Sequence, residues 1–289
     1  MLMTNNRKNH ARRGFTLPEL LVGMVVVAII GAALTRLLTV QGRFFDRQGM
    51  SNAARNVSRG SLNRLVSDLR MIETSGGVLA ASPTSLTLRV PFAIGVVCSS
   101  NAQSTAASML PVDSVTYHAD GFYGFAWRNA VTGTYTYVEN PAAHDKTTGQ
   151  NACLAAAITT LPGRRTARIT PVVSGSSLGT PIFLYRRLRY EFKASTAVPG
   201  KIGLYRTTVF PGGAEDSEEL VAPFGPTARY RFFVASDNQT AQDNPPANLG
   251  DIRGIELHLD GVSEVIAAGK TAPESAPFTT AVFFKNRIN

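Results

Sequence analysis

The longest uncharged hydrophobic run of the chain lies near its N-terminus, from Leu20 to Leu34. Extended back to Phe15, it has the roughly 20 positions that a helix needs to cross about 30 Å of hydrocarbon. We therefore expect a membrane-embedded helix over residues 15–40. Arg36 is expected to mark its outer edge, since a guanidinium side chain can bury its methylene groups and keep its charge in water; a contact with another subunit is the alternative.

A second helical pattern follows without a break. Between Gly42 and Glu73 apolar residues recur at helical spacing and arginines lie largely between them, which predicts an amphipathic helix over residues 41–75 that continues the first. Gly76 and Gly77 are expected to end it. Its apolar stripe, which needs a sheet to cover it, consists of Val57, Leu62, Leu65, Val66, Leu69 and Ile72.

Residues 76–289 are typical of a strand-rich globular domain, because no second long helix is evident. A hairpin turn is expected at residues 131–134, and loops at residues 99–111, 140–163 and 236–250. Short links favour an antiparallel sheet, so the expected fold class is α+β, with the long N-terminal helix packed on the sheet. Strands are expected near residues 85–92, 112–118, 122–130, 134–139, 165–173, 181–193, 202–210, 229–235, 252–260 and 279–286.

Part of the formal net charge of +9 lies ahead of the apolar segment, in Arg7, Lys8, Arg12 and Arg13, with no acidic residue among them. Positive charge before a membrane segment is retained in the cytoplasm, so these residues specify topology before they suggest nucleic acid. The chain beyond the segment is then expected on the exported side.

Cys98 and Cys153 both lie on that exported side, where a disulfide can form. Closing a loop of this length would stabilise the fold by roughly 4 kcal/mol in the loop-entropy description. Two separately buried thiols are the alternative. The pair has no C-x-x-C spacing, so a zinc ribbon or a redox motif is not expected.

Three interpretations compete for the N-terminal segment. A secretory signal peptide would be cut after Ala33, but Glu19 at the entry of the apolar run and the helical pattern beyond the cut disfavour it. An uncleaved signal anchor fits the length of the run. The third interpretation rests on the order of residues 12–22, which is R-R-G-F-T-L-P-E-L-L-V.

This stretch resembles the class III leader of type IV prepilins. In that family a short basic leader ends in glycine, a prepilin peptidase cuts before phenylalanine or methionine, and the new amine is methylated. The resemblance implies a leader at residues 1–14, cleavage between Gly14 and Phe15, and N-methylation of Phe15. It places Glu19 fifth in the mature chain, the position of the family's glutamate.

An ionised carboxylate in an apolar helix is costly and is normally paired or functional. The resemblance implies that the α-amine of Phe15, from the same or a neighbouring subunit, pairs with Glu19 and sets the axial register of subunits. A side chain that reaches lipid headgroups is the alternative. Pro18 in the first turn has no intrahelical acceptor to lose, so the helix can still begin there.

Catalytic chemistry finds little support, because His10, His118, His144 and His258 are scattered and no phosphate-binding loop is present. No cofactor or metal is expected. The acidic residues 214–219 and the Asp-Asn pairs at 237–238 and 243–244 could bind calcium but lack EF-hand spacing, and a solvated loop is the expectation for residues 214–219.

Two basic clusters, at residues 164–168 and 185–190, could take up single-stranded DNA. In a strand, however, Arg187 and Arg189 share one face and Arg186 points to the other, which dilutes the patch. A solvated face or a subunit contact is expected instead.

Short patterns in residues 180–289 resemble PilW-type minor pilins and J-type pseudopilins of type II secretion. The resemblance implies a non-enzymatic subunit with a type IV pilin-like fold that starts filament assembly, with prepilin peptidase, other pilins, and the assembly platform with its ATPase as partners. It implies a single-pass protein of the bacterial inner membrane with its C-terminal domain outside the cytoplasm. The alternative is a membrane-anchored binding protein or adhesin that does not polymerise.

Overall fold

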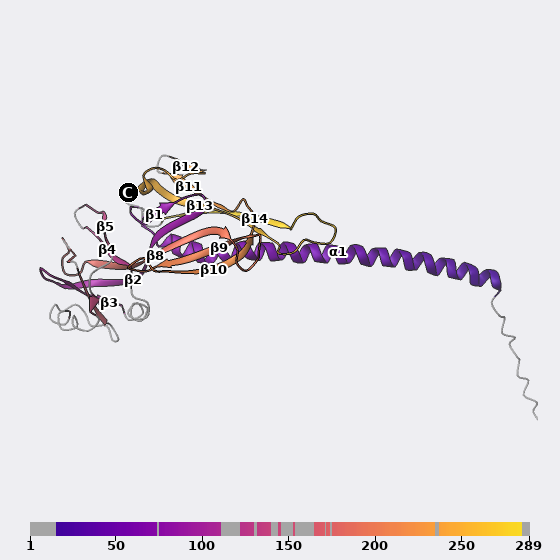
Figure 1. The fold of residues 1–289 in the computed structure, drawn as a ribbon, viewed down its shortest axis with the longest axis horizontal. Coiled ribbons are helices and arrows are strands. Elements are labelled where there is room, and N and C mark those ends of the chain that lie inside the picture. The colour runs from indigo at the N-terminus through magenta and orange to yellow at the C-terminus, as the bar shows by residue number, and fades with distance from the viewer. Residues whose placement is uncertain are drawn as a thin grey trace, which may run out of the picture.

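The computed structural model describes residues 16–73, 75–110, 122–129, 132–139, 144–145, 153, 165–170, 172–173, 175–234 and 237–284. It shows one long N-terminal helix that projects from a strand-rich domain (Figure 1). The described strands pair antiparallel throughout, so the expected α+β class, a long helix on an antiparallel sheet, is confirmed.

The helix α1 (Leu17–Arg70) is unbroken for 54 residues, a length of about 80 Å. Its side chains are exposed from Leu17 to Gly49, and burial against the sheet begins only with the second half. Of the expected apolar stripe, Leu65 and Leu69 are fully buried, and Val57, Leu62 and Val66 are partly buried against the core. The fully buried side chains recur at helical spacing at Ala54, Ser58, Ser61, Leu65 and Leu69.

The end of α1 precedes the glycine pair that the sequence suggested as the stop. Met71 has right-handed helical dihedral angles, its N–H donates to the carbonyl oxygen of Asp68 at 3.2 Å, and the N–H of Ile72 donates to that of Leu69 at 3.4 Å. The chain then turns into the sheet, with Ile72 fully buried in the same core. Gly76 lies in this turn at a φ of 83°.

The strands form one sheet that runs in the order β12, β11, β13, β10, β9, β8, β2, β3, β7, β6, with β1 on β2, β14 on β13, and the hairpin β4–β5 attached to β8. A short 3-10 turn, η1 (Leu249–Asp251), precedes β13. The strands are β1 (Val78–Ala81), β2 (Ser85–Ser100), β3 (Thr105–Met109), β4 (Gly124–Arg128), β5 (Tyr135–Glu139), β6 (His144–Asp145), β7 (Arg165–Ile169), β8 (Pro181–Ala194), β9 (Ile202–Val209), β10 (Glu215–Phe224), β11 (Arg229–Val234), β12 (Asp237–Gln242), β13 (Ile252–Val262) and β14 (Ser275–Phe283).

Most of the expected strands overlap an observed one; the stretch at 112–118 lies outside the described residues. The three expected loops are partly wrong. They contain β3, β6 and β12, whose small or polar residues gave no strand signal but pair with stronger neighbours. The expected hairpin turn is confirmed by β4 and β5, which pair from Gly124↔Glu139 to Arg128↔Tyr135.

The buried residues form two main clusters joined by the long strands β2 and β8. The larger cluster lies under α1 and includes Leu65, Leu69, Tyr190 and Phe232. The second lies at the far end of the same strands, around Phe125, Trp127 and Leu184. β2 and β8 pair from Ser85↔Glu191 to Val96↔Pro181, so one continuous ladder carries both clusters.

Polar contacts fix α1 on the sheet at two heights. The Tyr190 hydroxyl on β8 donates to Oδ2 of Asp68, and the guanidinium of Arg206 on β9 lies 3.8 Å from the same oxygen. Ten residues earlier, the Ser58 hydroxyl accepts the N–H of Gly261 at 3.1 Å and lies within hydrogen-bonding distance of the Leu259 and Ala276 carbonyls. The helix is therefore held in a single rotation and height.

Candidate functional site

The first turn of α1 contains the glutamate that the sequence singled out. Thr16 is the N-cap in extended conformation, Pro18 lies in the first turn, and Glu19 is at the third helical position. The Thr16 N–H and hydroxyl both donate to Oε2 of Glu19, at 3.3 and 3.2 Å. This capping arrangement satisfies one of the N–H groups that a helix start leaves free and turns the carboxylate back toward the N-terminus.

Gly14 and Phe15, the expected cleavage and methylation positions, lie outside the described residues, so their assignment remains a prediction. Glu19 is one helical turn beyond Phe15 and is the only acidic residue of α1 before Asp46. Its side chain is exposed. An isolated carboxylate on an apolar rod that another subunit can approach is the arrangement that an intersubunit pair requires.

Within the exposed half of α1, residues 20–34 form an uncharged and almost wholly apolar surface. The hydropathy and length of α1 are sufficient to cross a membrane, and none of the most apolar stretch is buried within the molecule. The hydroxyls of Thr35 and Thr39 donate to the carbonyl oxygens of Gly31 and Thr35, each at 2.8 Å, which satisfies their polar groups within the helix. Arg36 is exposed on this surface. The segment is therefore suited to lie in lipid or among neighbouring helices.

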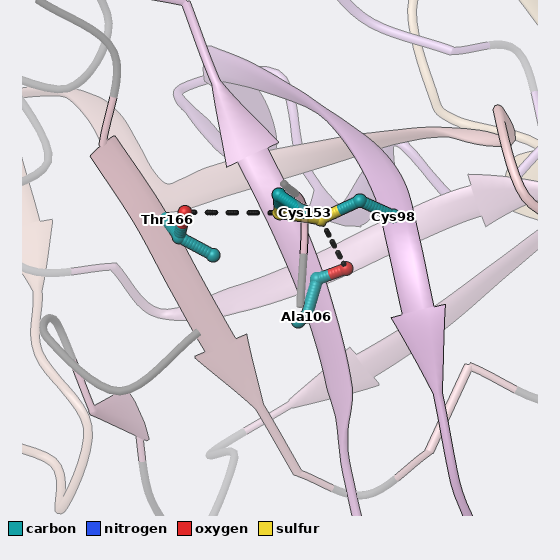
Figure 2. Close-up of a disulfide and its surroundings, with 4 residues drawn as sticks. All are labelled: Cys98, Ala106, Cys153 and Thr166. Atoms are coloured by element: carbon teal, nitrogen blue, oxygen red, sulfur yellow. Dashed lines mark hydrogen bonds between the residues drawn. A yellow bond between two sulfur atoms is a disulfide. The ribbon is translucent and has the colours of Figure 1, made fainter. Parts of the chain in front are cut away.

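The two cysteines are joined. Cys98 on β2 and Cys153 are bonded, with a Cα–Cα distance of 4.8 Å, and both are almost completely buried (Figure 2). The Thr166 hydroxyl on β7 donates to Sγ of Cys153 at 3.7 Å, and Sγ of Cys98 lies 3.3 Å from the carbonyl oxygen of Ala106 on β3. The disulfide thus joins β2 to Cys153 beside β3 and β7, at the far end of the sheet. The sequence had left open whether the two thiols are bridged or separately buried.

The acidic segment 214–219, expected as a solvated loop, forms the start of β10 instead. The expectation was wrong because the acids face bases across the sheet. Glu215 binds Arg189 in a bidentate pair at 2.9 and 2.6 Å, and Glu218 lies 3.5 Å from Arg206. Glu215 and Glu218 are therefore both engaged in ion pairs with neighbouring strands of the sheet. Among the described residues no cluster of acids, histidines or cysteines suits a metal ion.

Glu219 is the most heavily bonded of these carboxylates. Ser195 and Thr196 donate to it from their hydroxyls, the N–H groups of Thr196 and Ala197 donate to it, and so does the Tyr205 hydroxyl at 2.8 Å. Burial alone would raise the pKa of Glu219, but these donors outweigh it and lower the pKa to about 2. It ties the turn between β8 and β9 to β10 and is structural.

The histidines remain dispersed. His258 bonds Thr279 across β13 and β14 at 2.9 Å, His144 contributes its backbone to β6, and His10 and His118 lie outside the described residues.

The expected division of the second basic cluster is confirmed, because Leu188 and Tyr190 are buried while Arg187 and Arg189 share the opposite face. That face is already engaged. Arg187 donates to the Tyr123 hydroxyl at 2.9 Å, and Arg189 is paired with Glu215. Arg186 stacks on Phe92, 4.5 Å from its ring centre. Of the first cluster, Arg164 lies outside the described residues.

Sequence reasoning missed Asp68, which attaches the helix to the sheet, and Glu219, which ties the turn between β8 and β9 to β10. An acid placed between Leu65 and Leu69 on an apolar stripe was the available signal for Asp68. The hydrogen-bond donors to Glu219 are more than ten positions away in the sequence, and no local sequence pattern predicts these bonds.

Comparison with known proteins gives one match. Residues 9–35 match the family model described as the prokaryotic N-terminal methylation motif. No curated protein and no solved structure matches the chain. The matched region covers the end of the basic leader, the Gly14–Phe15 junction and the start of the exposed apolar helix. The motif indicates a type IV pilin-like or pseudopilin-like precursor, and α1 is long and apolar enough to cross a membrane.

Proposed function

We propose that this chain is a minor pilin or pseudopilin, a structural subunit that helps to start a type IV pilus or a type II secretion pseudopilus. The observation that carries the proposal is the division of α1. Its first half is an apolar rod that nothing in the described chain covers, and its second half is part of the core of the domain. A subunit built this way can exchange lipid for neighbouring helices without rearranging its own core.

In this proposal prepilin peptidase removes residues 1–14 and methylates Phe15. Residues 15–40 then lie first in the bacterial inner membrane and later in the filament core. Residues 41–75 continue the helix into the domain at residues 76–289, which lies outside the cytoplasm. The four basic leader residues support this orientation.

Glu19 would determine the stagger between subunits. Once Phe15 is the first residue, its amine lies one helical turn from the carboxylate, so a neighbouring subunit displaced by about 6 Å along the axis brings the two charges to the same height. The cost of leaving the carboxylate unpaired in an apolar surrounding, several kcal/mol on insertion scales, would drive this pairing.

A minor subunit is favoured over a major one by the size of the domain and by the resemblance of residues 180–289. The partners would be other pilins or pseudopilins, the inner-membrane assembly platform and its ATPase. A membrane-anchored adhesin or binding protein that does not polymerise remains the competing function, and it has no need of a free amine at Phe15.

The experiment is mass spectrometry of the N-terminus of the full chain purified from its native membrane. We expect a mature chain that begins at methylated Phe15, and an intact leader in Gly14→Ala. The matched control is Gly23→Ala, where an added Cβ meets no atom within 4 Å, and it should be processed normally. Glu19→Gln should be processed but should fail to enter filaments.

An intact leader in the unaltered chain, or cleavage after Ala33, would contradict the proposal. Normal processing with undiminished filament entry of Glu19→Gln would leave the prepilin assignment standing and remove the register role of Glu19. Normal processing with no filament entry of the unaltered chain would favour the adhesin.

A further inference from the structure

The last strand of the sheet, β14, runs beside the second half of α1 and has one free edge (Figure 1). It pairs with β13 along its whole length and with no other described strand. Two grooves, of about 390 and 680 Å³, lie between β14 and the helix. The described part of the chain therefore leaves a strand edge and a groove open side by side.

The register of the ladder between β13 and β14 shows which backbone groups of β14 are free. At one end of the ladder the N–H of Phe284 donates to the carbonyl oxygen of Arg253. At the other end the N–H of Ser263 donates to the carbonyl oxygen of Glu274. Hydrogen-bonded and non-bonded pairs alternate along an antiparallel ladder, and the pairing here runs without a shift. Even-numbered residues of β14 therefore bond β13, and odd-numbered residues direct their N–H and C=O groups outward.

Three residues, Thr279, Ala281 and Phe283, thus present unused backbone donors and acceptors along the free edge. These groups form no hydrogen bond with another described residue. Pro277 occupies the preceding outward position and has no N–H to offer, so further pairing would begin at Thr279. Natural edge strands are usually protected by charged side chains or by a covering segment, yet β14 carries no charge from Ser275 to Phe283. The edge is therefore suited to receive a further strand.

The two grooves beside this edge are basic on the helix side. Arg55 and Arg59 line the smaller groove, and Arg70 lines the larger. All three arginines are exposed, none forms an ion pair with a described residue, and no acidic residue lines either groove. Between the arginines, Leu62 and Val66 give the larger groove an apolar lining. Every second side chain of an added strand would enter these grooves, so acidic and apolar side chains would complement them.

We propose that β14 receives an extended, acidic segment of a different pilin-like subunit, which pairs with residues 279–283 and places acidic side chains beside Arg59 and Arg70. The inference rests on the proposed function, because a minor subunit meets partners unlike itself. Main-chain hydrogen bonds would supply affinity, and the arginines would select the segment by its charge. The contact forms once for each copy of this chain and does not have to repeat along the filament.

The test is hydrogen exchange of the full-length chain in detergent micelles, with and without a short synthetic peptide that alternates valine with glutamate. At saturation the peptide should slow exchange of the Thr279, Ala281 and Phe283 amides by about tenfold or more, because each gains a hydrogen bond. The amides of Thr280 and Val282 already bond β13 and are the internal reference. A peptide that alternates valine with lysine should give no protection.

Substitutions separate the strand edge from the charge. Ala281→Pro removes one outward N–H and keeps the bonds to β13, so it should weaken binding of the glutamate peptide by about tenfold. Ala281→Val keeps the N–H and is the matched control. Arg59→Glu with Arg70→Glu should weaken binding by about tenfold or more and favour the lysine peptide, whereas Arg59→Lys with Arg70→Lys should bind as before. Near-ultraviolet circular dichroism checks folding, and Ala281→Glu, which puts a like charge at the edge, replaces Ala281→Pro if that variant is unfolded.

The natural occupant is identified in the native membrane by a photo-reactive phenylalanine in place of Ser67, which is exposed in the larger groove. We expect a cross-link to an acidic stretch of another protein that has its own N-terminal methylation motif, and loss of this cross-link in Ala281→Pro. Cross-links only to lipid, to a second copy of this chain or to a protein without that motif overturn the choice of partner.

Absence of protection at the three amides, equal binding of the two peptides, or protection of Thr279 and Phe283 that survives Ala281→Pro overturns the inference. The N-terminal mass is measured in the same cells. Any of these results in chains processed at Phe15 leaves the proposed function intact, whereas an unprocessed leader refutes the proposed function and the choice of partner with it.

Discussion

Tyr190, a fully buried side chain of the sheet, donates its hydroxyl to the carboxylate of Asp68 on the long helix. Burial, and after it the charge of Asp68, raise the pKa of Tyr190, so the phenol is protonated and remains a donor at neutral pH. Arg206 completes the contact from β9. The helix is thereby bound to the sheet by a charged group that has little access to water.

Asp68→Ala should consequently lower the free energy of unfolding by about 1–3 kcal/mol, because it leaves the Tyr190 hydroxyl without its acceptor and removes one of the two carboxylates beside the Arg206 guanidinium. The measurement is urea unfolding of the full chain in detergent, followed by near-ultraviolet circular dichroism. Asp216→Ala, which removes an exposed acid, is the control and should change stability by less than about 0.5 kcal/mol. Equal stability of the two variants would show that the contact contributes nothing.

Close packing of helix and sheet predicts opposite effects for two glycine-to-alanine changes. A Cβ at Gly261 would lie 2.2 Å from the carbonyl oxygen of Ala54, which is backbone and cannot move aside, so Gly261→Ala should destabilise by about 1–3 kcal/mol or more. A Cβ at Gly60 would lie 3.7 Å from Val221, an ordinary contact, and alanine favours the helix by roughly 0.5–1 kcal/mol. Thermal unfolding of both variants decides the matter, and a loss of stability in Gly60→Ala would contradict this packing.

The low pKa of Glu219 predicts acid sensitivity. A carboxyl whose pKa is about 2 in the folded chain and near its ordinary 4.5 when unfolded stabilises the fold above the higher value, and that stabilisation is lost as the pH falls toward the lower one. Urea midpoints measured from pH 5 to pH 2 should therefore fall more steeply for the unaltered chain than for Glu219→Gln. Glu218→Gln is the matched control and should follow the unaltered chain. Parallel curves for all three would refute the assignment.

Removal of the disulfide by Cys98→Ala with Cys153→Ala should lower the free energy of unfolding by about 4 kcal/mol, since the bond closes a loop across a sequence separation of 55 residues. The loosening should be local. Hydrogen exchange is expected to increase in β3 and β7, whereas the buried half of α1, which lies in the other cluster, should exchange as before. Uniformly faster exchange would indicate that the two clusters unfold together.

The helix and the class of fold could be predicted because their signals are local. An apolar run followed by a stripe at helical spacing specifies α1, and alternation along β8 assigned Arg187 and Arg189 to one face. β10 could not be predicted, because its acidic start is typical of a loop until Arg189 and Arg206 neutralise it from neighbouring strands. β3 is composed of small residues and acquires its conformation from β2 and β7.

In the candidate site, the position of Glu19 followed from counting residues within one motif. The grooves between α1 and β14 could not be predicted, since each combines residues from the helix with residues of a strand more than 140 positions later. Such surfaces exist only after the sheet has assembled on the helix.

The unequal surroundings of α1 give its two halves different tolerances to substitution. Before Met50 a side chain contacts only lipid or a neighbouring helix and not the domain itself, so Leu37→Ala should leave the stability of the domain unchanged. From Ala54 onward one side of the helix packs into the core of the domain, and Leu65→Ala on that side should cost about 2–5 kcal/mol. Sequence variation along this one uninterrupted helix should therefore be limited in two different ways. In the first half it is limited by contacts with other molecules, and in the second half by packing within the domain.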